Sequence, residues 1–347
     1  MRQLTFVRPG VLDWQEVSEP ELQGPDEAIV RPIAVGRCDV DAAIVRGRAP
    51  FQGPFAIGHE FVAEIVALGD QATGFQLDQL VIVPYHISCG RCPRCRRGLT
   101  ANCSSVSPLS MYGLGAVGGA WGGAFSDLVR VPFAQGMLVP LPGDVEPRGA
   151  VGLGDNLSDA WRTVGPYVEE LPGAPVLVVG GSAWSIGLYA AAIAHVLGAS
   201  NVDYVDTDPG RLALAQSVGA KPIEGPPPER LGPYAITVDA SADRDGLACA
   251  LRSLEPGGVC TSVGIYYRRT PVPLLDMYDT GITFRTGRAH ARAIIPRTLE
   301  LIRSRRLHPE RLVTRWASWD DAPDALGDPS AKVVIMRSPA AGKPEGT

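Results

Sequence analysis

Several features that mark nucleic-acid-binding, secreted and membrane proteins are missing from this chain of 347 residues. Its formal net charge is −5, and it lacks the basic excess or stripe that a phosphate-binding surface usually shows. The N-terminus, MRQLTFVRPG, has no apolar core that could serve as a signal peptide. The most apolar stretch, 183–199, is interrupted by Ser185 and His195 and is too short to span a membrane. We therefore expect a cytoplasmic protein with no nucleic-acid partner and no membrane anchor.

Internal repeats and low-complexity tracts are also absent, and the composition is that of an ordinary globular protein. Hydrophobic residues make up 45% and charged residues 20%, which argues against disorder. The length suits two domains better than one. Five of the seven cysteines lie between Cys38 and Cys103. In a reducing compartment, clustered cysteines more often bind metal or carry out chemistry than form disulfides.

The hydrophobic pattern changes near residue 150. Before that point, short β-prone runs are broken by Gly and Pro, which predicts a barrel-like or sandwich-like β domain. These runs are 27–34, 61–68, 79–84 and 124–131. From residue 175 onward, apolar runs typical of buried strands alternate with helical patterns, which predicts a parallel, doubly wound α/β sheet. The predicted strands are 175–179, 202–205, 235–238 and 258–263, and the predicted helices are 185–197, 209–218 and 244–254. Beyond this region, a helix is expected over 294–304 and a strand over 332–336.

The most specific motif is Cys89-x2-Cys92-x2-Cys95-x7-Cys103. Tetrahedral Zn²⁺ takes four thiolates at short spacings, and Gly90, Pro93 and Gly98 supply turns between them. Because four thiolates leave no open coordination position, this site is predicted to be structural.

The predicted strand 175–179 runs into Gly180-Gly181-Ser182-Ala183-Trp184-Ser185-Ile186-Gly187 and then into a helix. Glycines at this point allow the backbone to approach a pyrophosphate at the positive end of the helix. The spacing is two residues longer than the usual GxGxxG. Asp206 ends the second strand, where an acidic residue would bind the ribose hydroxyls and repel a 2′-phosphate, so NAD is favoured over NADP. A nucleotide fold that binds another ligand, such as a methyl donor, is the alternative at this stage.

A second group of metal ligands is suggested by Cys38, by His59 at the start of a strand, and by Asp155 near the predicted domain junction. Cysteine, histidine and a carboxylate with one open position make a chemically sound catalytic zinc set.

Taken in order, Cys38, Gly58-His59-Glu60, the four cysteines, the Gly-rich turn and Asp206 resemble the zinc-containing medium-chain dehydrogenase/reductase family. That family includes alcohol, polyol and threonine dehydrogenases, and the match covers nearly the whole chain. The resemblance implies a GroES-like β-barrel catalytic domain at 1–150, completed by 288–347, and a Rossmann NAD-binding domain at 151–287. It implies a zinc-dependent oxidoreductase that transfers hydride between NAD(H) and a small alcohol or carbonyl substrate. It also implies a homodimer or homotetramer.

By family position, the resemblance implies two zinc ions per chain. Cys38, His59 and Asp155 would hold the catalytic zinc, with Glu60 as a neighbouring or exchangeable ligand, and Asp159 would lie beside the nicotinamide. The residues expected to bind the cofactor are Gly180, Gly181, Ser182, Ile186, Gly187, Asp206, Arg211 and Val263.

Three features depart from the family pattern, and one of them, Asp78-Gln79-Leu80-Val81 in place of Gly-Asp-Arg-Val, is a turn change of little functional weight. The stretch after the catalytic cysteine often carries a hydroxyl and a histidine that relay the alcohol proton, but here these positions are Val40 and Ala43. Asp159 stands where many relatives have Thr. Asp159 or Asp41 could substitute for the relay, or water could carry the proton. The alternatives are a reductase of an iminium or conjugated carbonyl, and a catalytically silent zinc protein that binds nucleotide. The segment 107–125 either lines the substrate pocket or is a packed loop beside the four cysteines.

Overall fold

The computed structural model describes residues 1–328 and 332–338, and the chain divides into two compact units. Unit 1 contains Met1–Ser158, His290–Ser304 and the described residues from His308 onward. Unit 2 contains Asp159–Ala289 and Arg305–Leu307. Unit 1 is therefore discontinuous in sequence, since unit 2 is inserted into it.

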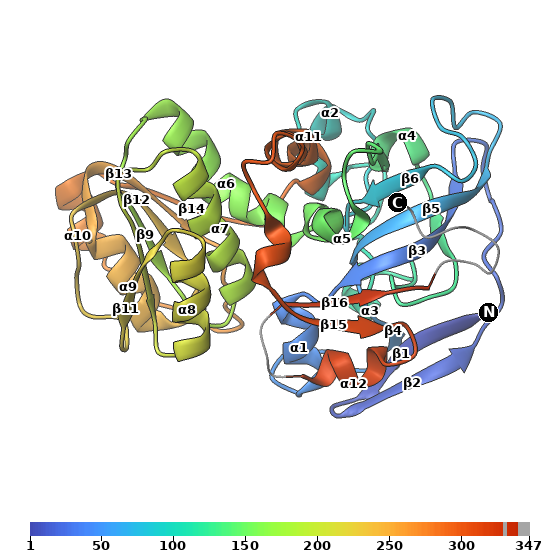
Figure 1. Ribbon diagram of the computed structural model, residues 1–347, viewed down its shortest axis with the longest axis horizontal. Coiled ribbons are helices and arrows are strands. Elements are labelled where there is room, and N and C mark those ends of the chain that lie inside the picture. Colours follow the sequence, from blue (N-terminus) through green and yellow to red (C-terminus); the bar gives the residue numbers. More distant parts are fainter. Residues whose placement is uncertain (329–331, 339–347) are drawn as a thin grey trace. The chain divides into compact units, whose positions relative to one another are not determined.

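Unit 1 is built on β-sheets. Its larger sheet has the order β15–β16–β3–β5–β6–β8, with β7 also paired to β3. These strands are β3 (Ala28–Gly36), β5 (Glu60–Leu68), β6 (Leu80–Val83), β7 (Val129–Val131), β8 (Val139–Pro140), β15 (Val313–Ser318) and β16 (Lys332–Met336). The smaller sheet joins β2 (Val11–Glu16), β1 (Arg2–Arg8) and β4 (Phe55–Ala56). Strand β16 follows unit 2 in sequence and pairs antiparallel with β3, so the red strand β16 and the blue strand β3 are neighbours in Figure 1.

Short helices and turns at the strand ends position the polar residues of unit 1. The helices are α1 (Asp39–Val45), α2 (Pro93–Arg96), α3 (Gly115–Gly118), α4 (Ala134–Met137), α5 (Pro147–Ala150), α11 (Ala291–Arg303) and α12 (Ala322–Gly327). Cys38 caps α1 shortly after the end of β3, and His59 immediately precedes β5. Asp155 follows the 3₁₀ turn Val151–Gly154, which packs against β6 so closely that a Cβ on Gly154 would lie 2.6 Å from the Val83 carbonyl oxygen. Three distant segments are therefore brought to one place.

Unit 2 contains a six-stranded sheet in the order β11–β10–β9–β12–β13–β14, and every neighbouring pair is parallel. The strands are β9 (Val176–Val179), β10 (Val202–Asp206), β11 (Lys221–Glu224), β12 (Tyr234–Asp239), β13 (Leu254–Ser262) and β14 (Thr283–Thr286). The helices are α6 (Asn156–Glu170), which begins in unit 1, and α7 (Trp184–Val196), α8 (Pro209–Ser217), α9 (Arg244–Arg252) and α10 (Leu274–Thr280). In chain order the sheet reads 3-2-1-4-5-6, which is the Rossmann strand order.

The predicted α/β fold class is confirmed, and the structure corrects its details. The central strands were predicted because buried parallel strands are continuous apolar runs, and β9 is buried at all four positions. The helix predicted to end at residue 254 ends at Arg252, and Leu254 already begins β13. The edge strands β11 and β14 were not predicted because their half-exposed sequences, KPIE and TFRT, lack an apolar run.

Candidate active site and metal centres

The four cysteines of the sequence motif converge in unit 1. All four are buried, and their sulfur atoms lie within 4.8 Å of one another. Cys92 Sγ is 4.0 Å from Cys103 Sγ. Zn–S bonds of about 2.3 Å in a tetrahedron place two sulfurs roughly 3.8 Å apart, so the donor set fits Zn²⁺. Gly90 and Gly98 have φ of +72° and +79°, the left-handed conformation that glycine adopts most easily, at the two tight turns.

The sulfurs of this four-cysteine loop (residues 89–103) are supported mainly by backbone N–H groups. Cys92 Sγ accepts from the N–H of Cys95 at 3.4 Å and of Ser104 at 3.5 Å. Cys103 Sγ accepts from the N–H of Cys89 and of Ser105, each at 3.4 Å. The hydrogen bonds from Ser104, together with that from Cys95, lower the pKa of Cys92 to about 5. The fold of the loop therefore favours a thiolate, which is the form that binds metal.

A second cluster brings together Cys38, His59 and Asp155. One ligand atom from each lies within 4.8 Å of the others, and all three residues are buried. His59 Nε2 is 3.3 Å from Asp155 Oδ2. Metal bonds of about 2.0–2.1 Å in a tetrahedron place two ligand atoms roughly 3.3 Å apart, so this pair has the separation that zinc requires. Three protein ligands leave a fourth position for a reacting oxygen, which is the pattern of catalytic zinc sites.

His59 lies between two carboxylates. Its Nε2 faces Asp155, and its Nδ1 is 3.4 Å from Asp41 Oδ1. Burial opposes protonation of the imidazole, but the negative charges of Asp41 and Asp155 outweigh it and raise the pKa of His59 well above its usual value. Asp41 also accepts a hydrogen bond from the Cys38 backbone N–H at 3.0 Å. Asp41 thus faces the ring nitrogen opposite to Asp155, which is the place of a carboxylate that orients a metal-bound histidine.

Glu60 is buried beside this cluster and is paired with a lysine. Lys332 Nζ donates to Glu60 Oε2 at 2.6 Å, and the two side chains are 1% and 0% exposed. Burial raises the pKa of Glu60 to about 7 even though the ammonium of Lys332 opposes this effect. The carboxylate oxygens of Glu60 are not among the ligand atoms of Cys38, His59 and Asp155 that lie within 4.8 Å of one another. Its role as an exchangeable ligand stays a prediction.

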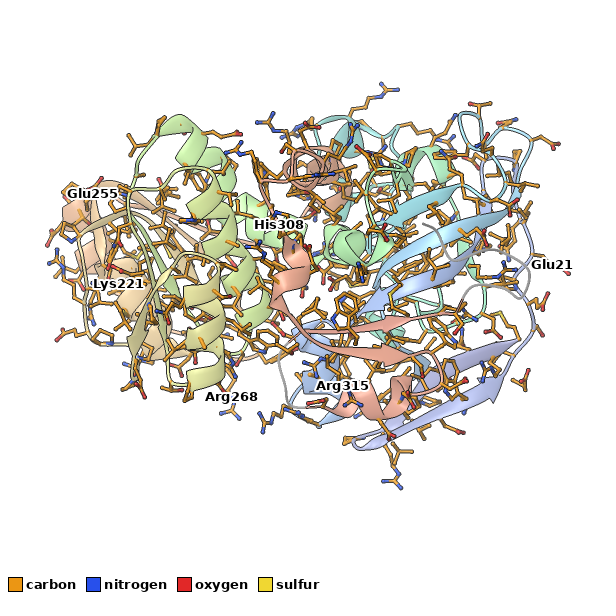
Figure 2. The ribbon with its side chains drawn as sticks, in the orientation of Figure 1. Glu21, Lys221, Glu255, Arg268, His308 and Arg315 are labelled. Atoms are coloured by element: carbon orange, nitrogen blue, oxygen red, sulfur yellow. The ribbon has the colours of Figure 1, made fainter. Side chains whose placement is uncertain are left out.

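Buried charge sets this region apart from the rest of the chain. Charged side chains such as Glu21, Lys221 and Arg268 are exposed and point outward in Figure 2. Asp41, by contrast, is fully buried, as are Glu60 and Lys332 to within 1%. Buried charges are costly unless they are paired or bind a metal, so a cluster of this kind indicates a functional site.

In unit 2, the Gly-rich turn connects β9 to α7, at the point where the strand order reverses. A Cβ on Gly180 would lie 2.4 Å from Asp206 Oδ2, and a Cβ on Gly181 would lie 2.6 Å from Ser241 Cα. A Cβ on Gly187 would approach Ala240 Cβ to 3.1 Å. The glycines therefore allow the turn to pack closely against β10 and the β12–α9 loop, as dinucleotide-binding turns require.

The other predicted cofactor-binding residues surround this turn. Asp206 is buried at the end of β10 and accepts from the Asp208 backbone N–H at 3.0 Å. Arg211, on α8, lies 3.3 Å from Asp206 Oδ2 and donates to the Gly181 carbonyl at 3.1 Å. The Ser182 N–H donates to the Ser241 carbonyl at 3.0 Å. Ile186 is buried on α7, and Val263 follows β13 with its N–H bonded to the Asp239 carbonyl. Their contacts with a cofactor stay predictions.

Asp159 is the first residue of unit 2, and its carboxylate forms an ion pair with Arg162 one turn later on α6. Arg162 also donates to the Gly287 carbonyl. The carboxylate is therefore engaged within unit 2, and its predicted catalytic role is untested.

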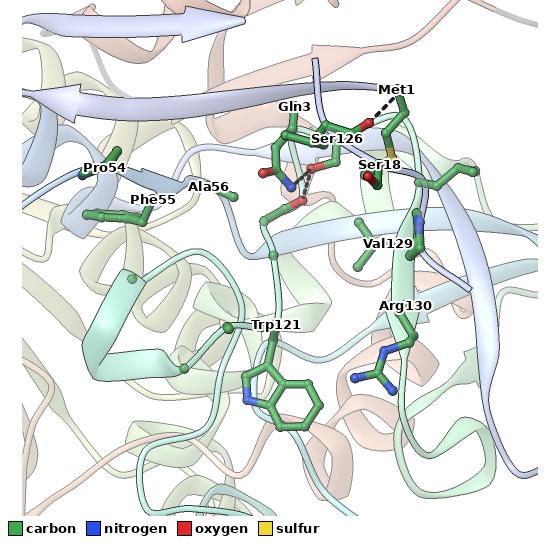
Figure 3. Close-up of a pocket in the computed structure, with 18 of the residues that line it drawn as sticks. Met1, Gln3, Ser18, Pro54, Phe55, Ala56, Trp121, Ser126, Val129 and Arg130 are labelled. Carbon is green, nitrogen blue, oxygen red and sulfur yellow. Dashed lines mark hydrogen bonds between the residues drawn. The ribbon is translucent and has the colours of Figure 1, made fainter. Parts of the chain in front are cut away.

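The segment 107–125 is packed in the interior at some positions and lines a surface hollow at others. Met111 and Tyr112 are packed in the interior, and the Tyr112 hydroxyl donates to the Arg130 carbonyl at 2.9 Å. Gly115, Gly119 and Trp121 line a hollow of about 660 Å³ in unit 1, shown in Figure 3. Neither Cys38, His59 nor Asp155 lines this hollow. A role of the segment in substrate binding stays a prediction.

Asn156 and Lys332 were not predicted from the sequence. Asn156 donates to Cys38 Sγ at 3.1 Å and to Asp155 Oδ2 at 2.7 Å, and Lys332 donates to the side-chain oxygen Asn156 Oδ1 at 2.9 Å. One signal was available for Lys332, because a lysine heads the otherwise apolar run of β16. For Asn156, the only signal in the sequence was its position next to Asp155.

An α/β chain that joins a GroES-like β unit to a Rossmann sheet, with a Cys/His/Asp cluster and a four-cysteine loop, defines a zinc-type dehydrogenase. The alcohol dehydrogenase GroES-like domain family matches residues 24–143. A probable zinc-binding alcohol dehydrogenase from Mycobacterium tuberculosis is 33% identical over 311 residues, covering 88% of this chain and 79% of the relative. An L-threonine 3-dehydrogenase from Chelativorans sp. is 33% identical over 280 residues, covering 76% and 77%.

Solved structures agree with these sequence comparisons. An alcohol dehydrogenase from Thermus sp. ATN1 has a TM-score of 0.87 and 32% identity, covering 97% of this chain and 100% of that one. The chain belongs to the zinc-containing medium-chain dehydrogenase/reductase family. Within residues 1–328 and 332–338, no helix combines the length and apolar character needed to cross a bilayer.

Proposed function

We propose that the chain is an NAD-preferring, zinc-dependent alcohol dehydrogenase with one structural and one catalytic zinc. The observation that carries the proposal is the buried cluster of Cys38, His59 and Asp155, whose ligand atoms lie within 4.8 Å of one another. A zinc ion held there would act as a Lewis acid toward an alcohol or carbonyl oxygen. The four-cysteine loop would hold the structural ion, because its four thiolates complete the coordination.

The residues around the catalytic zinc would have different roles. Asp41 would keep the His59 ring oriented, and Asp155 would supply an anionic oxygen ligand. The Lys332 ammonium keeps the Glu60 carboxylate paired at 2.6 Å within the buried cluster. Neither Val40 nor Ala43 on α1 can accept or donate a proton, so we propose that water carries the proton of the alcohol.

The preference for NAD rests on Asp206. Its carboxylate lies at the end of β10 beside the Gly-rich turn, where it can accept hydrogen bonds from ribose hydroxyls and would repel a 2′-phosphate. Arg211 is ion-paired with Asp206, which offsets part of that repulsion. We therefore expect NADH to bind more tightly than NADPH, by a modest factor.

We further propose that unit 1 is the catalytic domain, that unit 2 binds the nucleotide, and that the chain self-associates through α10. Leu274, Leu275 and Tyr278 on this helix are 68%, 72% and 82% exposed. Adjacent exposed apolar side chains of this size mark an association surface. The mass of the Leu275→Asp variant in solution, compared with that of the unaltered chain, tests whether α10 is this surface.

The test of the proposed function is zinc content and cofactor binding in the unaltered protein and in Cys38→Ser, followed by turnover on alcohols, aldehydes and conjugated carbonyls. We expect two zinc ions, one of which is lost in the variant, tighter binding of NADH than of NADPH, and oxidation of small alcohols. One zinc in both proteins would refute a catalytic metal. Turnover of conjugated carbonyls alone would favour a reductase, which needs no relay at Val40 and Ala43.

A further inference from the structure

One fully buried side chain outside the proposed ligand set contacts two of its three members. Asn156 Nδ2 lies 3.1 Å from Cys38 Sγ and 2.7 Å from Asp155 Oδ2, and the residue is 0% exposed. A primary amide carries two N–H donors on one nitrogen. Each of the two anionic ligands can therefore receive its own hydrogen bond from Asn156.

The orientation of this amide is determined by Lys332. The ammonium donates to Asn156 Oδ1 at 2.9 Å, to Glu60 Oε2 at 2.6 Å and to the Arg37 carbonyl at 3.1 Å. An ammonium has three donors and no acceptor, so the oxygen of the amide must face it. The nitrogen must then face Cys38 and Asp155. The assignment of the amide atoms thus follows from the chemistry of its neighbours.

We propose that Asn156 is a positioning residue of the catalytic metal centre. It fixes the Cys38 sulfur and the Asp155 oxygen relative to each other, and it is itself fixed by Lys332 of β16. This inference rests on the proposed function, since it assumes that Cys38, His59 and Asp155 hold zinc. Groups that orient metal ligands through hydrogen bonds typically contribute 10- to 100-fold to metal affinity or activity, and we expect about that range here.

Two substitutions of Asn156 differ in how many of its hydrogen bonds to the ligands they remove. Asn156→Leu has nearly the same size but neither donors nor an acceptor, whereas Asn156→Ser is small and keeps one hydroxyl donor, so one of the two ligands can retain a hydrogen bond. Asn201→Leu is the matched control, because the Asn201 amide donates to the Asp203 carboxylate at 2.8 Å in unit 2, outside both metal clusters. All variants are made in the full chain.

Zn²⁺ affinity is measured by competition with a chelator, and the site is examined separately by the absorption spectrum of Co²⁺ bound in its place. We expect Asn156→Leu to weaken one of the two metals about 10- to 100-fold, with a smaller loss in Asn156→Ser. The thiolate-to-cobalt band should move to longer wavelength, because a sulfur that loses a hydrogen bond gives up its electron more easily. The second metal and the Asn201→Leu control should match the unaltered protein.

The proposal is overturned if Asn156→Leu binds both metals within about threefold of the unaltered affinity, a change too small for an orienting group, and leaves the cobalt spectrum unchanged. A loss of thermal stability without either change would also overturn it, since that result indicates a purely structural role. If Asn156→Leu does not fold, Asn156→Ser gives the same decision. Failure of the proposed function looks different, because the unaltered protein would then hold one zinc and Cys38→Ser would not reduce it.

Discussion

The four-cysteine loop and the Cys38 cluster both lie in unit 1, yet their ligands are supported by different parts of the chain. In the loop, hydrogen bonds to sulfur come mainly from backbone N–H groups within residues 89–105. In the cluster, side chains surround the ligands: Asn156 donates to Cys38 and Asp155, and the carboxylate of Asp41 faces His59. Backbone support persists when a side chain is replaced, whereas side-chain support does not.

On the proposed function, this difference distinguishes a site that only holds zinc from a site whose zinc takes part in the reaction. A closed set of four thiolates needs only a stable loop. An open site needs its ligands to be oriented and their charge controlled, and both tasks fall to the surrounding side chains. Single substitutions around the ligands should therefore have larger effects at the Cys38 cluster than at the loop.

The largest effect is expected from loss of a ligand in the cluster. We expect His59→Gln to slow hydride transfer at least about a thousandfold, because Lewis-acid catalysis contributes several kcal/mol to the barrier. Alcohol oxidation under saturating NAD measures the change. His308→Gln, at a half-exposed histidine paired with Glu310, is the control and should retain activity. Activity within tenfold of normal in His59→Gln would mean that the cluster is not the reacting metal site.

Loss of a ligand in the loop should release metal with a smaller effect on catalysis. We expect Cys103→Ser to lose about half of the bound zinc and to open the loop locally, because three thiolates no longer complete the tetrahedron. Trypsin cleavage at the arginines of the loop, Arg91, Arg94, Arg96 and Arg97, measures the opening. Cys249→Ser, at a buried free thiol of unit 2, is the control. Hydride transfer as slow as in His59→Gln would show that the two metals are not separable.

Substitution behind the histidine tests the importance of side-chain support. Asp41 accepts from the Cys38 N–H and faces His59 Nδ1, and an amide offers only one acceptor in its place. We expect Asp41→Asn to weaken the catalytic zinc by about tenfold or more. Chelator competition provides the measurement, with Asp39→Asn on the same helix as the control. An unchanged affinity would contradict the assigned role of Asp41.

The smallest effect is expected from loss of a side-chain hydroxyl that donates to a loop sulfur. Ser105 Oγ lies 3.2 Å from Cys89 Sγ. A single hydrogen bond contributes about 0.5–1.5 kcal/mol, and a zinc-bound thiolate shares its charge with the metal, so Ser105→Ala should weaken the structural zinc by roughly tenfold at most. The rate of zinc release to a chelator measures this. A larger loss of zinc affinity in Ser105→Ala than in Asp41→Asn would contradict the expectation that side-chain support matters more at the Cys38 cluster.

The contrast between a site built from one short segment and a site built from distant segments also explains which site residues the sequence could predict. The four cysteines were identified from spacing alone because all of them fall within the single short segment 89–103. Cys38, His59 and Asp155 were suggested by the sequence, but their convergence depends on the fold, since they come from three segments that are far apart in the chain. Asn156 and Lys332 were missed because a lysine at the head of an apolar strand does not reveal its partner, and Asn156 has no pattern of its own. Their roles arise from a contact between β16 and the start of α6, and no periodicity in the sequence records such a contact.

The pairing of Lys332 with Glu60 also has a consequence for the order of events during synthesis. The two residues are 272 positions apart, and β16 is among the last described elements to leave the ribosome. The four-cysteine loop can close on an ion as soon as its own short segment has emerged. The Lys332 ammonium, which neutralises Glu60 beside the Cys38 cluster, takes its place only after unit 2 has been translated and β16 has paired with β3. On the proposed function, the structural site would therefore be complete at an earlier stage of synthesis than the full set of side chains around the catalytic site.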